Sequence, residues 1–235
     1  MKPPIFLGIE TSGKSSGLAL ATDGRVMAEM VEDSSCGHNE VLMPLLDRLL
    51  KGAGVKVCDL SGIGVDVGPG MFTSLRVGTS TAKGLAVAHR LPVVGVNSLW
   101  ALARTARPAL DRVLSLIDAR KHQLYAALYL KGRQALPPSV VTPEELVSQA
   151  RSVLPSCAGL VVAGNGAGIC AELLAAAGIE SVLTGVEVPS PGVVAIEAGE
   201  RVARGQTNEL AALEPLYLRR TDAELTREKR LAPNG

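Results

Sequence analysis

The two halves of this sequence carry the same order of expected elements. A strand ending in Ile9-Glu10 leads into a hairpin, and a strand ending in Ile117-Asp118 leads into another hairpin. Later in each half, an apolar strand runs into a glycine loop, at residues 65–68 and 161–164. Similar separations between the matching segments indicate duplication of one strand-hairpin-helix-strand-helix unit. Two such units would face each other across a cleft, where ligands usually bind.

Strand and helix signals along the chain predict an α/β fold. Strands are expected at residues 5–9, 17–21, 25–31, 63–67, 92–96, 113–118, 123–130 and 160–163. Helices are expected at residues 39–50 and 74–89, at residues 98–107 with Ser98 as the cap, after the capping box at Thr142, and at residues 169–177 and 190–204. Pro108 marks the boundary between a first lobe, residues 1–108, and a second lobe, residues 109–235. The last helix has the option of packing back on the first lobe.

The composition narrows the class of protein. The chain is 47% hydrophobic but only 3% aromatic, so small aliphatic side chains must fill its core. A formal net charge of +1 argues against a protein whose main function is to bind nucleic acid. The four cysteines form no CxxC pair, and the sequence contains no signal-peptide pattern and no apolar run of membrane-spanning length. We therefore expect a cytoplasmic protein without a membrane span.

The glycine run at residues 68–78 predicts a strand, a tight loop and a helix in succession. Gly68 and Gly70 allow backbone angles that a Cβ would forbid, and Thr73 is placed to cap the helix. A glycine loop that feeds a helix N-terminus can bind an anion. The same glycines are equally compatible with a turn that needs them for geometry alone. In that case the loop launches a packing helix, and Arg76 holds the loop or reaches a partner.

Residues 8–15 match the Walker A pattern GxxxxGK[ST] letter for letter. A phosphate-binding P-loop needs a helix directly after the lysine, whereas the residues after Lys14 predict a hairpin. A P-loop is therefore disfavoured. Thr11, Ser12, Gly13 and Lys14 keep a candidate role as a hairpin turn that lines the cleft and contacts a phosphate.

Glu10 and Asp118 end the first strand of each half, so two carboxylates could flank the cleft and hold Mg²⁺ through water. Equally, each carboxylate could cap a turn or pair with Lys14 or Arg120. The histidines have no helical metal-ligand spacing, and no serine lies in a nucleophile motif. We predict no catalytic residue and no metal site.

Two helices of the first half have faces that could bind a partner. In the helix at residues 39–50, six apolar positions recur, more than one narrow stripe requires. They include the candidate partner-binding residues Leu42, Leu45, Leu46 and Leu49. The helix at residues 74–89 is rich in small residues, which allow another helix to approach closely. Burial inside the domain is the alternative, and the apolar width of the first helix favours a partner.

Together, these motifs resemble the TsaB (YeaZ) family over nearly the whole chain. The motifs are Ile9-Glu10-Thr11-Ser12, Leu42-Met43-Pro44-Leu45-Leu46 after His38, Gly68-Pro69-Gly70-Met71-Phe72-Thr73-Ser74-Leu75-Arg76-Val77-Gly78, Gly95-Val96-Asn97-Ser98-Leu99, Ile117-Asp118-Ala119-Arg120 and Pro215-Leu216-Tyr217-Leu218-Arg219. The resemblance implies an actin/Hsp70/hexokinase-type (ASKHA) fold with two similar lobes. It also implies a role in forming threonylcarbamoyladenosine beside the anticodon of tRNA, as a partner of TsaD and TsaE, with homodimers when the chain is alone.

Departures from TsaD indicate a non-catalytic relative. TsaD carries a metal-binding HxxxH after the strand equivalent to residues 92–96, and the resemblance aligns its histidines with Ser98 and Leu102. Neither residue replaces imidazole as a metal ligand. No cofactor is therefore expected, with ATP or ADP and Mg²⁺ bound only together with partners, and any tRNA contact is indirect. The rival interpretation is a nucleotide-dependent enzyme that uses Glu10 and Asp118 around Mg²⁺; a P-loop NTPase and a peptidase are less favoured.

Overall fold

The computed structural model describes residues 3–34, 37–107, 109–154, 156 and 158–218. The boundary residue Pro108, Cys36, Cys157 and Arg219 of the last motif lie outside the described residues. The elements are β1 Ile5–Glu10, β2 Ser15–Thr22, β3 Arg25–Asp33, α1 His38–Ala53, the 3₁₀ turn η1 Val57–Asp59, β4 Leu60–Gly68, α2 Phe72–His89, β5 Val93–Asn97, α3 Ser98–Ala106, β6 Arg112–Arg120, β7 Gln123–Leu130, β8 Arg133–Val141, α4 Pro143–Val153, β9 Leu160–Ala163, α5 Ala167–Ala176, β10 Ser181–Leu183 and α6 Pro191–Ala203.

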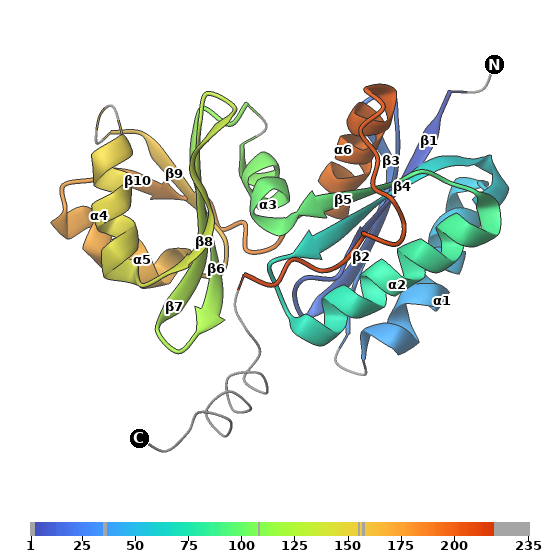
Figure 1. The fold of residues 1–235 in the computed structure, drawn as a ribbon, viewed down its shortest axis with the longest axis horizontal. Coiled ribbons are helices and arrows are strands. Elements are labelled where there is room, and N and C mark those ends of the chain that lie inside the picture. The colour runs from blue at the N-terminus through green and yellow to red at the C-terminus, as the bar shows by residue number, and fades with distance from the viewer. Residues whose placement is uncertain (1–2, 35–36, 108, 155, 157, 219–235) are drawn as a thin grey trace.

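Two five-stranded mixed sheets form the two lobes (Figure 1). The first has the order β3-β2-β1-β4-β5, and the second has β8-β7-β6-β9-β10. Each half therefore repeats one topology, in which the first two strands pair in antiparallel fashion and the first and fourth in parallel. The turns match as well, since Asp23-Gly24 and Lys131-Gly132 both have positive φ at their two central residues, as a type I′ hairpin requires. The predicted duplicated α/β fold is confirmed.

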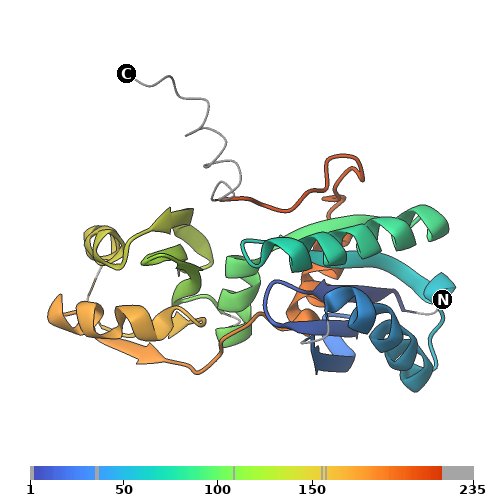
Figure 2. The same ribbon diagram turned by 90° about the horizontal axis from the view of Figure 1, so that it is seen from below.

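The lobes exchange one helix each. Helix α3 follows the last strand of the first sheet but packs on β6, β7 and β9 of the second, where Leu99 and Ala103 meet Val113 and Tyr129. Helix α6 comes from the second half but packs on β1, β2 and β4 of the first sheet. Figure 2 shows α3 lying between the two lobes, which lie side by side.

Helices α1 and α2 cover the opposite face of the first sheet. Leu18 and Leu20 of β2 point toward these two helices, whereas the alternating Ala19 and Ala21 pack against α6. A Cβ at Gly8 would overlap the carbonyl oxygen of Pro191 and come within 2.6 Å of the Ala195 nitrogen, so α6 lies directly on β1. Within the described residues, no helix is both long and apolar enough to cross a membrane.

The candidate partner leucines of α1 belong to the core. Leu42, Leu45, Leu46 and Leu49 are at most 3% exposed and pack with the first sheet. The expectation that these side chains form a partner surface is wrong, because one side of α1 is fully used by the underlying sheet. The groove between α1 and α2, about 380 Å³, reaches the buried Leu42 and is otherwise lined by different residues of the two helices. We define the α1–α2 face as Asn39, Met43, Thr73, Arg76 and Ser80.

At two helix starts the capping residue differs from the predicted one. Helix α2 begins at Phe72 with Met71 as its N-cap, so Thr73 lies inside the first turn and does not cap it. Helix α3 is capped by Asn97, whose side chain accepts a hydrogen bond from the Trp100 nitrogen, and Ser98 is already helical. In both cases the serine or threonine hydroxyl was the expected cap, but the residue before the helix has the extended backbone that a cap needs.

Candidate functional site

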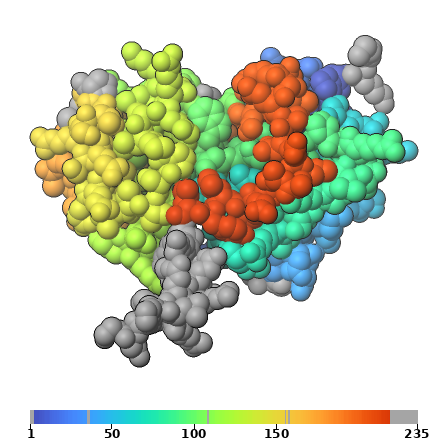
Figure 3. All heavy atoms as spheres, viewed as in Figure 1, coloured from blue at the N-terminus to red at the C-terminus, as the bar shows by residue number. Residues whose placement is uncertain are grey.

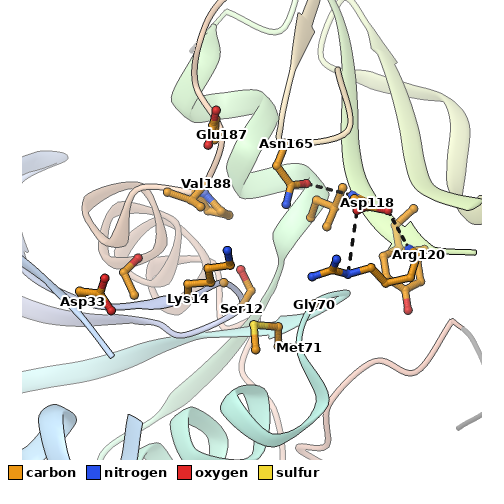
Figure 4. Close-up of a pocket in the computed structure, with 16 residues that line it drawn as sticks. Ser12, Lys14, Asp33, Gly70, Met71, Asp118, Arg120, Asn165, Glu187 and Val188 are labelled. Carbon is orange, nitrogen blue, oxygen red and sulfur yellow. Dashed lines mark hydrogen bonds and ion pairs between the residues drawn. The ribbon is translucent and has the colours of Figure 1, made fainter. Parts of the chain in front are cut away.

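A cleft of about 530 Å³ lies between the two lobes. Its first-lobe wall is the turn between β1 and β2 together with the glycine loop before α2, and its second-lobe wall is the C-terminal end of β6 with the loop before α5 (Figure 4). The lining residues include Ser12, Gly13, Lys14, Gly70, Met71, Asp118, Arg120, Asn165, Glu187 and Val188. Ligand sites usually occupy such places, so this cleft is the candidate site.

The turn after β1 is a hairpin and not a P-loop. Glu10 pairs with Gly17 across the β1–β2 ladder, so Lys14 is followed by a strand. No helix N-terminus is therefore available to wrap a phosphate in the Walker A manner. The predicted hairpin turn that lines the cleft is present in part, because Ser12, Gly13 and Lys14 are among the lining residues. Figure 4 shows the Lys14 side chain pointing into it.

Glu10 and Thr11 do not line the cleft. The Glu10 carboxylate is 1% exposed and accepts hydrogen bonds from the Ser12 backbone nitrogen at 2.6 Å and the Ser12 hydroxyl at 2.5 Å. Thr11 is fully buried and donates its hydroxyl to the Ser74 carbonyl at 2.9 Å. The expectation that both residues face a ligand is therefore corrected, because the turn folds them inward beneath Ser12.

Asp66, which the sequence analysis did not single out, lies beside Glu10. Its Oδ1 accepts hydrogen bonds from the Ser98 hydroxyl at 2.5 Å and from the Gly68 nitrogen at 2.7 Å. Its other oxygen, Oδ2, is buried and has no partner among the described residues. Burial raises the pKa of both Asp66 and Glu10, and the nearby Asp66 charge raises the pKa of Glu10 further. A carboxylic acid inside the otherwise apolar strand β4 is the signal that could have identified this pair.

Asp118 lies at the cleft, near the C-terminal end of β6, with 31% of its side chain exposed. Its carboxylate accepts from the Arg120 nitrogen at 2.7 Å, and its own nitrogen donates to the Asn165 side chain at 2.9 Å. The Arg120 guanidinium lies 4.0 Å from Asp118 with 79% of its side chain exposed. The turn-capping interpretation of Asp118 is therefore correct.

The predicted pair of carboxylates across the cleft is not formed, since Glu10 lies beneath its first-lobe wall. A water-mediated Mg²⁺ site between Glu10 and Asp118 is therefore not supported. In the part of the chain that the structure describes, no three His, Cys, Asp or Glu residues gather closely enough to hold a metal ion.

The glycine loop before α2 has a packing role. Gly68 has a φ of 103°, and a Cβ at Gly70 would lie 2.6 Å from the Ser12 carbonyl oxygen. The Met71 nitrogen donates to that same oxygen at 2.9 Å, so this amide is already occupied and does not face an anion. The loop therefore uses its glycines to bring α2 onto the β1–β2 turn.

Arg76 joins α2 to the segment after α6. Its guanidinium lies 3.7 Å from the centre of the Phe72 ring, and its Nε donates to the Tyr217 hydroxyl at 2.9 Å. The Leu216 nitrogen also donates to the Val67 carbonyl. Figure 3 shows this C-terminal segment running across the front of the molecule between the two lobes. We call residues 206–218 the C-terminal strap, which Arg76 holds on α2.

Comparisons with known proteins agree with this fold. The family model of TsaD, described as tRNA N6-adenosine threonylcarbamoyltransferase, matches residues 30–225. The Escherichia coli tRNA threonylcarbamoyladenosine biosynthesis protein TsaB is 29% identical over 220 residues, covering 91% of this chain and 94% of that protein. A tRNA N6-adenosine threonylcarbamoyltransferase from Nitratidesulfovibrio vulgaris is 40% identical, but over only 41% of this chain and 31% of the transferase.

Solved structures show the same architecture. YeaZ from Pseudomonas aeruginosa superposes with a TM-score of 0.76 at 29% identity, covering 92% of this chain and all of that one. A ROK hexokinase from Thermus thermophilus, at 15% identity and a TM-score of 0.53, shows the fold alone. The fold is therefore of the two-lobed actin/Hsp70/hexokinase class. Within it, the chain belongs to the TsaD family and to its TsaB (YeaZ) branch.

Proposed function

We propose that this chain is a non-catalytic scaffold subunit of a tRNA-modifying complex. It binds a TsaD-type threonylcarbamoyltransferase, with TsaE, for the formation of N6-threonylcarbamoyladenosine beside the anticodon of tRNA. It acts in the cytoplasm and forms a homodimer when alone. Nucleotide with Mg²⁺ binds only in the assembled complex, and the contact with tRNA is indirect. The name of the Escherichia coli relative, aligned along almost its whole length, supports this pathway.

The observation that carries the non-catalytic role is the environment of Ser98 and Leu102. These are the residues that the resemblance aligns with the two metal-binding histidines of TsaD. Ser98 is buried and donates its hydroxyl to Asp66, and Leu102 is fully buried in α3. A leucine has no donor atom, and the serine hydroxyl is already engaged. Neither side chain is therefore suited to supply the metal ligand that the resemblance places at this position in TsaD, which supports a non-catalytic role.

The proposed contact with the partner is the α1–α2 face. Met43 is 50% exposed on α1, and Arg76 is exposed on α2 beside the groove between the two helices. An exposed methionine beside a groove is suited to packing against a helix of a second subunit. Small residues of α2 such as Ser80 and Thr81 line the groove and allow such a helix to approach closely.

Reconstitution with TsaD and TsaE from the same organism tests the proposal. We expect tRNA modification to require this chain, measured as threonylcarbamoyladenosine in digested tRNA. Met43→Glu should weaken binding to TsaD by tenfold or more, because it places a charge in the interface. The matched control is Met27→Glu, at a methionine 46% exposed on β3, which should bind normally. Full modification by TsaD and TsaE without this chain would contradict the proposal.

A further inference from the structure

The turn between β1 and β2 is shared by two surfaces of the first lobe. Ser12, Gly13 and Lys14 line the cleft. Together with Ser15 and Ser16, the first residues of β2, this turn contacts the N-terminal ends of both α1 and α2. The outer surfaces of these two helices form the α1–α2 face.

Helix α2 is bound to the turn by one main-chain hydrogen bond and by the Thr11 side chain. The Met71 nitrogen donates to the Ser12 carbonyl at 2.9 Å, and the Thr11 hydroxyl donates to the Ser74 carbonyl at 2.9 Å. A Cβ at Gly78 would overlap the Thr11 hydroxyl, so the helix backbone itself lies against the turn. Because close-packed backbones cannot slide independently, a displacement of α2 must move Thr11 and Ser12.

Helix α1 is bound to the same turn through its first residue, His38. The imidazole Nδ1 lies 3.0 Å from the Ser16 hydroxyl, and that hydroxyl lies 2.7 Å from the hydroxyl of Ser34. The Ser34 nitrogen in turn donates to the Lys14 carbonyl at 3.1 Å. His38 therefore begins a chain of hydrogen bonds that ends on a residue lining the cleft.

The half-buried imidazole is suited to this bridging role. Burial lowers the pKa of His38, and its hydrogen bond with the Gly13 backbone raises it by less. The ring is consequently neutral at pH 7 and offers one donor and one acceptor. These match the Gly13 backbone on one side and the Ser16 hydroxyl on the other.

We propose that binding of a partner on the α1–α2 face is transmitted to the cleft through the β1–β2 turn, with His38 as the positioning residue. This inference rests on the proposed function, which supplies the partner. Thermodynamic linkage then requires a ligand in the cleft to change the affinity for the partner by the same factor in return.

Hydrogen exchange of the backbone amides tests the inference. The full chain is measured alone and in complex with the TsaD subunit of the same organism, in peptides that cover residues 11–16. We expect exchange in this turn to slow by about fivefold or more in the complex, the lower end of typical allosteric coupling. His38→Leu should keep the binding of TsaD but lose the slowing, and His38→Gln, which can still donate and accept, should recover part of it.

Glu40→Gln, at an exposed residue in the first turn of α1 that lies outside the α1–α2 face, is the matched control and should behave as the wild type. Ser16→Ala repeats the test with a smaller change should His38→Leu fail to fold. Unchanged exchange in the wild-type complex, or equal slowing in His38→Leu, overturns the inference and leaves the proposed function standing. The absence of any complex overturns both.

Discussion

The two lobes present equivalent turns to the cleft, but only the first turn is built into its lobe. In the first lobe, Glu10 is buried and His38 at the start of α1 is half-buried against the turn. In the second lobe, Asp118 caps an exposed turn, and His122 meets Glu144 at the start of α4 as an exposed pair at 3.3 Å. Exposed pairs contribute little to stability. The two lobes thus share one topology, but the first turn is bound to its helix by buried contacts and the second by exposed ones.

Disrupting the packing of α6 on β1 of the first lobe should have the largest effect on stability. Gly8→Val should destabilise the first lobe by about 3 kcal/mol or more, because the new side chain must occupy space held by the backbone of α6. Thermal unfolding measures the effect. The control is Gly52→Ala in α1, where a Cβ meets nothing within 4 Å. This change should stabilise by about 0.5–1 kcal/mol through helix propensity. A Gly8→Val protein that melts like the wild type would refute the close approach of α6.

Removing the ion pair between α3 and α6 should have the next largest effect on stability. Arg104 of α3 donates to Glu197 of α6 at 2.6 Å, with 19% and 10% of the two side chains exposed. Arg104→Ala leaves Glu197 without its cation, and we expect a loss of about 2 kcal/mol in urea unfolding. Arg107→Ala removes an exposed pair with Asp111 and should cost less than about 1 kcal/mol. Equal losses in the two variants would show that α3 and α6 are not coupled by this pair.

The buried carboxyl pair predicts a pH dependence confined to the first lobe. Burial raises the pKa of Glu10 above its value in the unfolded chain, so the unfolded state releases the proton first as pH rises. Stability contributed by the neutral acid is therefore complete below the unfolded pKa and is lost progressively as pH rises toward the folded pKa. Glu10→Gln should reduce this loss, with a melting temperature at pH 8 higher than that of the wild type by several degrees, on the order of 1–2 kcal/mol.

Asp118→Asn is the matched change in the second lobe and should retain the pH profile of the wild type. Melting curves at pH 5 and pH 8 for the three proteins give the comparison. A wild-type protein equally stable at both values, or a Glu10→Gln variant with an unchanged profile, would show that the Glu10 carboxyl does not remain protonated in the fold.

The smallest expected effect concerns the C-terminal strap. Tyr217→Ala removes the ring that packs at 4.9 Å from Phe72 and the hydroxyl that accepts from Arg76. We expect a loss of about 1 kcal/mol and faster proteolysis within residues 206–218. Tyr217→Phe keeps the ring and should show less than half of this effect. Proteolysis at the wild-type rate in both variants would mean that Arg76 does not hold the strap.

Local chemistry explains what could be predicted from the sequence. Asp23-Gly24 specifies its hairpin by backbone preference alone, and the residues after Lys14 lack the helix that a P-loop requires. Because both signals depend on neighbours in sequence, the antiparallel pairing of β2 with β3 and the rejection of the Walker A match followed from them.

Long-range packing explains what could not be predicted. Helical periodicity marks the leucines of α1 as one face, but it does not distinguish the sheet of the same chain from a second subunit. The sequence predicts Glu10 at the cleft because it ends a strand, but it does not show that Ser12 and Asp66 surround the carboxyl group in the folded chain. Strand β8 contains Pro137 and Pro138, which weaken a strand signal and are tolerated here because β8 is an edge strand.

The exchange of α3 and α6 has a consequence for any attempt to divide the molecule. A gene cut near residue 108 would produce a first half whose sheet lacks α6 over one face, including β1 at Gly8 and β2 at Ala19 and Ala21. The second half would lose α3 from over Val113 and Tyr129. Each fragment would expose an uncovered apolar layer, so separate expression should give insoluble material, while co-expression should let each fragment complete the other as a split protein.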